Sequence, residues 1–259
     1  RVRLSDGQEA EDVKLSIALK QPAGSSFKIY FKGQSPEDDG DFYEDLPWVE
    51  MELEAGQIAG NSASQKSFTD FNFKLPSASL NGDGVFNYTT KRVNALTIGT
   101  AGSGYTNTSS VDFIVTGGGT PTRPAAIKAT ALAGGGLGTI EIVDPGRGYS
   151  TAPTITVAKN HTVSTYFASG TFVGNGSNLY EATIGGTTGA SSAPTHGSGT
   201  ATDGTVTWTY RGVRPVVTCT VADTTFERFK QFSSKIVMLT SNTSVIPEAK
   251  QLRIIALQA

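Results

Sequence analysis

The chain has 259 residues, of which 37% are hydrophobic and 17% charged, and its formal net charge at pH 7 is −2. This balance argues against a general nucleic-acid binder, which needs clustered Lys and Arg to neutralise phosphates, and no apolar run approaches the ~18 residues of a membrane-spanning helix. One cysteine, Cys219, and two histidines, His161 and His196, exclude an internal disulfide and the usual zinc modules, and they leave little for catalysis by histidine.

Short apolar runs that alternate or contain β-branched and aromatic residues predict strands along the first 91 residues. Prolines stand between the runs, as in sheet proteins. The runs cover residues 14–19, 27–31, 48–53, 68–73 and 85–88. Because the chain begins at Arg1 without a methionine, we expect it to be a processed product or part of a longer chain.

Six carboxylates crowd residues 37–45. Such a loop suits Ca²⁺ binding or the paired carboxylates of glycoside hydrolysis. The order of residues lacks the glycine and distal glutamate of an EF-hand, so we expect a hydrated or subunit-contacting loop and assign no metal ligand. The six are Glu37, Asp38, Asp39, Asp41, Glu44 and Asp45.

An internal repeat follows, in which residues 96–105 match residues 140–149 at an offset of 44. Each copy is an alternating strand that enters a Gly-x-Gly-Tyr turn, with a second strand after it at 111–115 or 155–157 that faces the first. We expect the glycines to supply positive φ and the tyrosines to be buried, with a further tight turn at 133–138. A phosphate-binding loop is disfavoured, since no helix pattern follows the glycines.

A second small β module is predicted between Tyr166 and Tyr210. Its last strand alternates threonine with Val206, Trp208 and Tyr210, so these three share one face. The Asp203-Gly204 dipeptide predicts a hairpin turn before that strand.

Strands are predicted again at 235–239 and 252–257. Residues 226–232 are ambiguous, because three phenylalanines at spacing three fit either one helical turn or a strand with a bulge.

Composition divides the chain. Residues 92–222 hold 22 of the 30 glycines but only 12 of the 44 charged residues, which marks an insertion between two conventional segments. We therefore predict an all-β protein, a discontinuous jelly-roll-like β-sandwich with inserted small β-repeat modules. The predicted parts are 1–91 (sandwich, first part), 92–160 (Gly-x-Gly-Tyr repeats), 161–214 (small β module) and 215–259 (sandwich, second part).

The flanks resemble virion structural proteins of tailed bacteriophages, especially cyanophage-type myoviruses. The similar segments are residues 23–32, 36–39, 46–52, 85–88, 226–239 and 245–257. The inserted glycine-tyrosine repeats resemble those of phage tail and baseplate proteins, and residues 179–210 resemble small β modules of phage fibres and of some carbohydrate-binding proteins. In the resembling proteins a short connection joins the two flanks, whereas about 130 residues separate them here.

The resemblance implies a non-catalytic structural protein of the virion tail, in a fibre or baseplate, that contributes to assembly and host attachment. It implies other tail or baseplate proteins as partners and a homotrimer as the assembly, and no catalytic residue or cofactor is carried over. Two alternatives stay open: a module that binds host-surface glycans, and a polysaccharide depolymerase that uses carboxylates of residues 37–45.

Aromatic residues are the candidates for sugar binding, because their rings stack on pyranose faces or fill cores. Trp208, Tyr210 and Tyr180 are the predicted ligand-binding residues, and Trp48 is a further aromatic of this kind. If the Trp208 and Tyr210 face is exposed it is the best carbohydrate candidate; if it is buried it is core. The histidines and Cys219 are expected to be structural.

Overall fold

The computed structural model describes residues 1–55, 67–190, 193–241 and 246–258. These residues form strands, and their only helical pieces are two 3₁₀ turns, η1 (Ser77–Ser79) and η2 (Thr108–Ser110), so the predicted all-β class is confirmed. Within the same residues no helix is long and apolar enough to cross a membrane.

The chain separates into two compact units. We call residues 1–89 with 225–259 the sandwich unit and residues 90–224 the insert unit. The first boundary lies two residues from the predicted one at 91. The second prediction, at 215, is wrong by ten residues, because the long strand that starts at Val216 carries the chain through the insert before the sandwich resumes.

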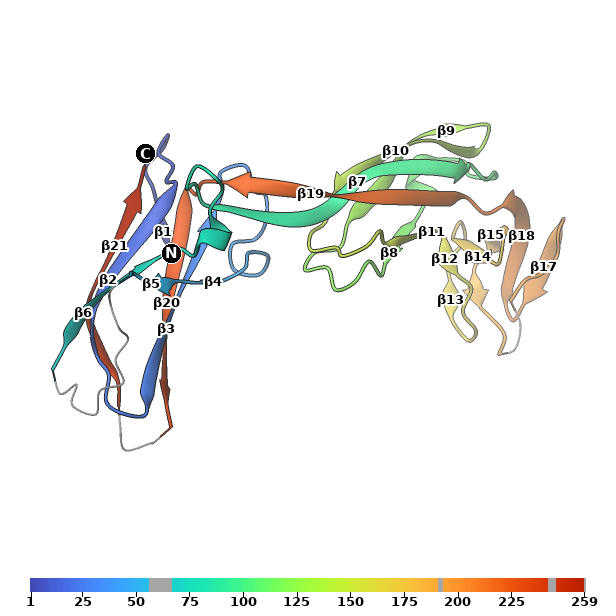
Figure 1. Cartoon of the computed structure of the whole chain (residues 1–259). Helices are drawn as coiled ribbons and strands as arrows, with labels where there is room; N and C mark the ends of the chain where they lie inside the picture. Colours follow the sequence, from blue (N-terminus) through green and yellow to red (C-terminus); the bar gives the residue numbers. More distant parts are fainter. Residues whose placement is uncertain (56–66, 191–192, 242–245, 259) are drawn as a thin grey trace. The chain divides into compact units, whose positions relative to one another are not determined.

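The sandwich unit consists of two four-stranded sheets (Figure 1). The strands predicted at 14–19, 27–31, 68–73, 235–239 and 252–257 are present, and residues 48–53 form two short strands in place of one. Of the strand predicted at 85–88, only residues 87 and 88 are in a strand, and it belongs to a sheet of the insert unit. The first sheet has the order β1 (Val2–Arg3), β20 (Gln231–Thr240), β3 (Ser25–Gln34), β4 (Val49–Glu50). The second has the order β21 (Glu248–Leu257), β2 (Asp12–Lys20), β6 (Thr69–Lys74), β5 (Glu52–Leu53).

An aromatic cluster closes the core between these sheets. Phe31 is buried and its ring centroid lies 5.3 Å from that of Phe86, 5.1 Å from that of Phe229 and 6.0 Å from that of Phe232. The ambiguous segment 226–232 is thus extended: β19 ends at Glu227, Arg228 has a left-handed φ of 60°, and β20 begins at Gln231. Because that irregularity turns all three phenylalanines inward, spacing three arises without a helix.

The insert unit contains four sheets. One has the order β7 (Asn87–Thr100), β19 (Val216–Glu227), β11 (Thr154–Val157), β8 (Phe113–Thr116). A five-stranded sheet has the order β12 (Lys159–Asn160), β14 (Phe172–Asn175), β15 (Asn178–Ile184), β18 (Val206–Val213), β17 (Thr200–Asp203). Two-stranded sheets pair β9 (Ala126–Ala133) with β10 (Gly136–Asp144) and β13 (Tyr166–Phe167) with β16 (Gly186–Thr187).

The Gly-x-Gly-Tyr repeats adopt the predicted turns. All four of their glycines have positive φ, and Tyr105 and Tyr149 are each 3% exposed. The prediction that the two strands of each repeat face each other is wrong. Strands β7 and β8 stand at opposite edges of one sheet, with β19 and β11 between them, and β10 lies in a different sheet from β11. The predicted tight turns at 133–138 and 203–204 are both hairpin connections.

The predicted division of the insert at residue 160 is wrong. Phe172 and Leu179, from the second predicted module, share a core cluster with Tyr105 and Ile155 from the first. The rings of Tyr105 and Phe172 lie 4.7 Å apart. Short strands that flank many glycines bury too little apolar surface by themselves, so the two modules complete one core together.

Candidate functional site

The predicted sugar-binding aromatics belong to the interior of the insert unit. Val206, Trp208 and Tyr210 do share a face of β18, but Trp208 and Tyr180 are both 0% exposed and only Tyr210 is half-buried. The rings of Tyr180 and Tyr210 are 5.8 Å apart. A ring without an exposed face has none to offer a sugar, so Trp208 and Tyr180 are core residues and their prediction as ligand-binding residues is corrected.

A buried polar network fixes Trp208. The carboxylate of Asp203 accepts hydrogen bonds from Trp208 Nε1 (3.3 Å) and from the backbone N–H of Gly189 (2.7 Å). The Nε2 atom of His161 lies 2.7 Å from Asp203 Oδ2, and both side chains are largely buried. Both carboxylate oxygens of Asp203 are engaged, so this network holds the hairpin in place.

The pKa of Asp203 lies below its usual value near 3.8. Burial acts to raise this pKa, but the hydrogen bonds from His161, Gly189 and Trp208 favour the carboxylate and together outweigh burial. A carboxyl group whose pKa is lower in the folded state stabilises the fold above its unfolded pKa, and this stabilisation is lost as the pH falls through the folded pKa.

The variant Asp203→Asn is therefore expected to lower the free energy of unfolding of the insert unit by about 1.5–3 kcal/mol at neutral pH, the range for hydrogen bonds to charged groups. The difference from the unmodified protein should shrink as the pH falls from the unfolded pKa near 3.8 through the lower pKa of folded Asp203, because the carboxylate that these hydrogen bonds favour is then lost. Thermal unfolding followed between pH 2 and 7 checks this, and a difference that stays constant with pH would contradict it. Asp223→Asn, an exposed carboxylate paired with Lys91, is the matched control.

A cavity of about 350 Å³ lies beside this network and is lined by residues 189, 193–196, 201–204 and 208. The ring of His196 packs 5.0 Å from that of Tyr180, whose hydroxyl donates to the His196 carbonyl. Neither ring nitrogen of His196 has a hydrogen-bond partner among the described residues. The ring of His196 therefore packs against Tyr180 without a hydrogen bond of its own nitrogens to these residues, so it is not the exposed or hydrogen-bonded imidazole that the polar surroundings suggest.

Carboxylates of residues 37–45 accept hydrogen bonds mainly from backbone N–H groups of the same loop. Asp38 is buried and accepts hydrogen bonds from the Tyr88 hydroxyl (2.5 Å) and the Gly40 N–H (2.8 Å). Asp41 Oδ1 accepts from the N–H groups of Tyr43 and Glu44, which lower its pKa. Among the residues that the structure describes, no group of three or more His, Cys, Asp or Glu side chains is placed to hold a metal ion.

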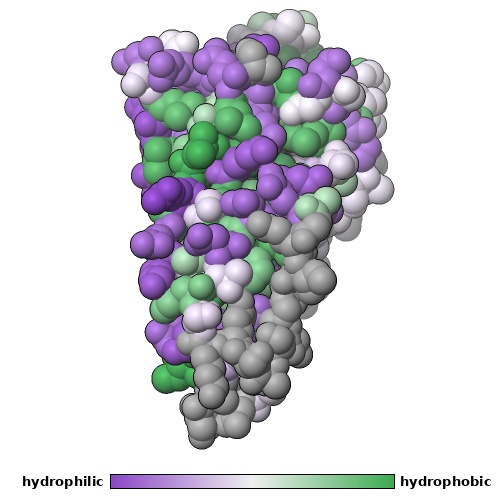
Figure 2. Space-filling model, turned by 60° about the vertical axis from the view of Figure 1, so that its left-hand side comes forward, coloured by the Kyte–Doolittle hydropathy of each residue, from purple (hydrophilic) through white to green (hydrophobic). Residues whose placement is uncertain are grey.

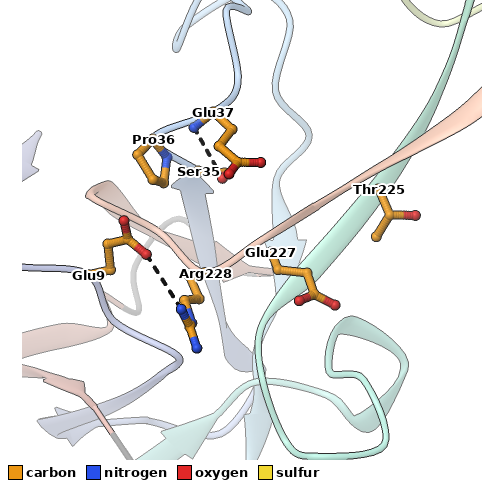
Figure 3. A pocket seen from close by; sticks show the side chains of 7 residues that line it. All are labelled: Glu9, Ser35, Pro36, Glu37, Thr225, Glu227 and Arg228. Carbon is orange, nitrogen blue, oxygen red and sulfur yellow. Dashed lines mark hydrogen bonds and ion pairs between the residues drawn. The ribbon is translucent and has the colours of Figure 1, made fainter.

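A polar pocket of about 320 Å³ opens in the sandwich unit next to Ser35 and Pro36 (Figure 3). Arg228 lies 3.9 Å from the carboxylate of Glu9 and 3.1 Å from that of Glu11. The other lining residues are Glu37, Thr225 and Glu227. Three carboxylates and one guanidinium line these walls, so the pocket has a net negative charge that Arg228 offsets in part.

A different group of side chains combines aromatic rings with cations on the outer face of the first sheet of the sandwich unit. We call it the Trp48 patch. Alternation along β3 points Tyr30 and Lys32 away from the core, and the register places Lys235 of β20 opposite Tyr30. Its members are Tyr30, Lys32, Phe42, Tyr43, Trp48 and Lys235.

Two ammonium groups share the indole ring of this patch. Lys32 Nζ is 4.8 Å and Lys235 Nζ 4.4 Å from the ring centroid of Trp48, and Lys235 Nζ is also 4.8 Å from that of Tyr30. Trp48 is 36% exposed and Tyr43 67%. The sequence analysis identified Trp48 but not the lysines. The period-two pattern of β3 was the available signal, because it places Lys32 on the outer face together with Tyr30.

Comparisons with protein-family models, with curated proteins and with solved structures found no significant match for this chain.

Proposed function

We propose that this chain is a non-catalytic structural component of the tail of a bacteriophage virion, a fibre or baseplate part that assembles with copies of itself and with other tail proteins. The resemblance of the flanking segments to phage virion proteins gives the class of protein. The self-assembly is supported by one observation, the long apolar edge strands of the sandwich unit.

Strand β21 stands at the edge of its sheet, and β20 is open on one side along most of its length, because in the part of the chain that the structure describes β1 covers only its first two residues. Within the described residues, β21 pairs only with β2, and β20 pairs only with β3 beyond its first two residues. Leu252 and Ile255 of β21 are 44% and 55% exposed. Figure 2 brings forward the side of the sandwich unit that carries β21, and green apolar side chains stand there among purple polar ones. Open edges of this length that carry exposed apolar side chains among charged ones can pair with a strand from another chain.

A non-catalytic function is supported by the state of the carboxylates in residues 37–45, which a depolymerase would need for hydrolysis. Asp38 and Asp41 spend their oxygens on hydrogen bonds within their own loop or with Tyr88. Hydrolysis requires two carboxyl groups that face a substrate and are available for proton transfer. Glycan binding has more support, because the Trp48 patch exposes aromatic surface beside cations.

The molar mass of the purified protein, measured by light scattering, tests the assembly. We expect about three times the chain mass of 27.1 kDa. The double variant Leu252→Lys, Ile255→Lys should reduce the mass to that of one chain, because charges on an edge strand oppose pairing.

Val163→Lys serves as the control, since Val163 is an exposed apolar residue of the insert unit. It should leave the mass unchanged. A single-chain mass for the unmodified protein, or an oligomer that survives the double substitution in a folded sample, would contradict edge-strand assembly.

A further inference from the structure

Two positively charged ammonium groups repel each other, yet the Trp48 patch holds those of Lys32 and Lys235 close to the same indole ring. The ammonium of Lys32 is buried and donates to the backbone carbonyls of Phe42 (3.2 Å) and Tyr43 (3.0 Å). Burial, and then the charge of Lys235, lowers the pKa of Lys32. The two groups therefore repel each other across the Trp48 ring, and an anion placed there would relieve that repulsion.

Lys235 is the member of the pair that a ligand can reach. It is exposed, and among the described residues its ammonium contacts the rings of Tyr30 and Trp48 but no carboxylate. Lys28, on the same outer face of β3, is by contrast neutralised by Glu50 at 3.0 Å. Of these two exposed lysines, Lys235 is therefore the one whose positive charge is available to bind an external anion.

The surroundings limit how highly charged that anion can be. Asp41 lies near enough to Lys32 to act on its pKa, and Glu50 flanks Tyr30 in the sheet register. A phosphate monoester, which carries nearly two negative charges on one group, would bring more negative charge against these carboxylates than a single carboxylate does, which is unfavourable. A sugar unit with one carboxylate beside an apolar ring face fits better, because Lys235 meets the charge and the exposed parts of Trp48 and Tyr43 meet the ring.

We propose that the Trp48 patch binds an acidic sugar, a uronic-acid-type residue of a polysaccharide whose carboxylate contacts Lys235 and whose ring contacts Trp48 and Tyr43. This inference rests on the attachment part of the proposed function and names its ligand class. It moves the glycan site from the insert unit, where the sequence placed it, to the sandwich unit.

Titration of the protein with oligogalacturonate, followed by tryptophan fluorescence, tests the proposal. Trp208 is fully buried in the insert unit, so a change in emission reports Trp48. We expect saturable binding that weakens strongly near 1 M salt, where the Debye length is about 3 Å. Lys235→Gln should weaken it about fivefold, the effect of losing one charge contact at a partly exposed site.

Three controls decide between explanations. Lys28→Gln, on the same sheet face, should leave the affinity within about twofold, since Lys28 already has Glu50 as partner. A neutral maltooligosaccharide of equal length should bind weakly, and single-stranded DNA should not bind more tightly than oligogalacturonate.

Equal loss of affinity in both lysine variants, preference for the neutral sugar, tighter binding of DNA, or no binding of oligogalacturonate would each overturn the proposal. The molar mass measured on the same sample separates this outcome from a failure of the assembly function. An oligomer that does not bind oligogalacturonate refutes only the sugar site.

Discussion

Replacing Trp208 with alanine is expected to lower the free energy of unfolding of the insert unit by about 3–5 kcal/mol, the usual cost of emptying a buried aromatic site. The side chain is fully buried, and its ring centroid lies 5.3 Å from that of Phe167 and 5.9 Å from that of His161. The substitution also removes the hydrogen bond that the indole N–H donates to Asp203. Calorimetry or urea unfolding, with the transition of the insert unit followed by amide exchange, measures the loss.

Tyr166→Ala is the matched control, because Tyr166 lies in the same part of the insert unit and is largely exposed. Its effect should stay within about 0.5 kcal/mol. If Trp208→Ala were as harmless as this control, Trp208 would not be the core residue that its burial indicates, and a role in ligand contact would return.

Replacing Phe31 with alanine is expected to cost the sandwich unit about 3–5 kcal/mol. Phe31 is the centre of the aromatic cluster, with three phenylalanine rings within 6.0 Å between centroids. Two of those rings, Phe229 and Phe232, come from the part of the chain that follows the insert. Unfolding of the sandwich unit by urea, with Trp48 emission as the probe, measures the effect.

A double-mutant cycle with Phe229→Ala should give a coupling of about 0.5–1.5 kcal/mol, as aromatic pairs in edge contact do. Tyr43→Ala, an exposed aromatic of the same unit, should change stability by no more than about 0.5 kcal/mol. Additive effects of the two phenylalanine substitutions would show that the two chain segments contribute separately and would contradict a shared core.

Period-two patterning was sufficient to predict the sandwich strands, because each of them has one buried and one outer face. Residues 14–19 and 27–31 became the centres of β2 and β3, with Leu15, Ile17, Ile29 and Phe31 buried as the alternation requires. The strand over Ala126–Ala133 escaped notice, because alanine, lysine and threonine give no clear contrast between its faces. Strand order was also beyond the pattern, since it depends on which distant segments meet.

Site prediction failed where one observation had two physical meanings. Trp208 and Tyr210 on one strand face indicate core or ligand surface equally well, and only the packing of Phe167 and Tyr180 against that face decides. The Trp48 patch joins residues about 200 positions apart, Lys32 and Lys235, through the pairing of β3 with β20. No local spacing contains that pairing, so the sequence analysis identified Trp48 and missed the two lysines that give the patch its charge.

The ends of the insert unit are tied to each other by the neighbouring strands β7 and β19 and by the ion pair of Lys91 with Asp223 at 3.3 Å. This bears on the order of folding. If the insert is unfolded, pairing of β20 with β3 must close a loop that contains the insert's roughly 135 residues. If the insert is already folded, its two ends are adjacent, and the loop is reduced to a short connection. The entropic cost of closure then falls by about 3 kcal/mol. An insert that folds first during synthesis would therefore bring β20 next to β3 as soon as β20 leaves the ribosome.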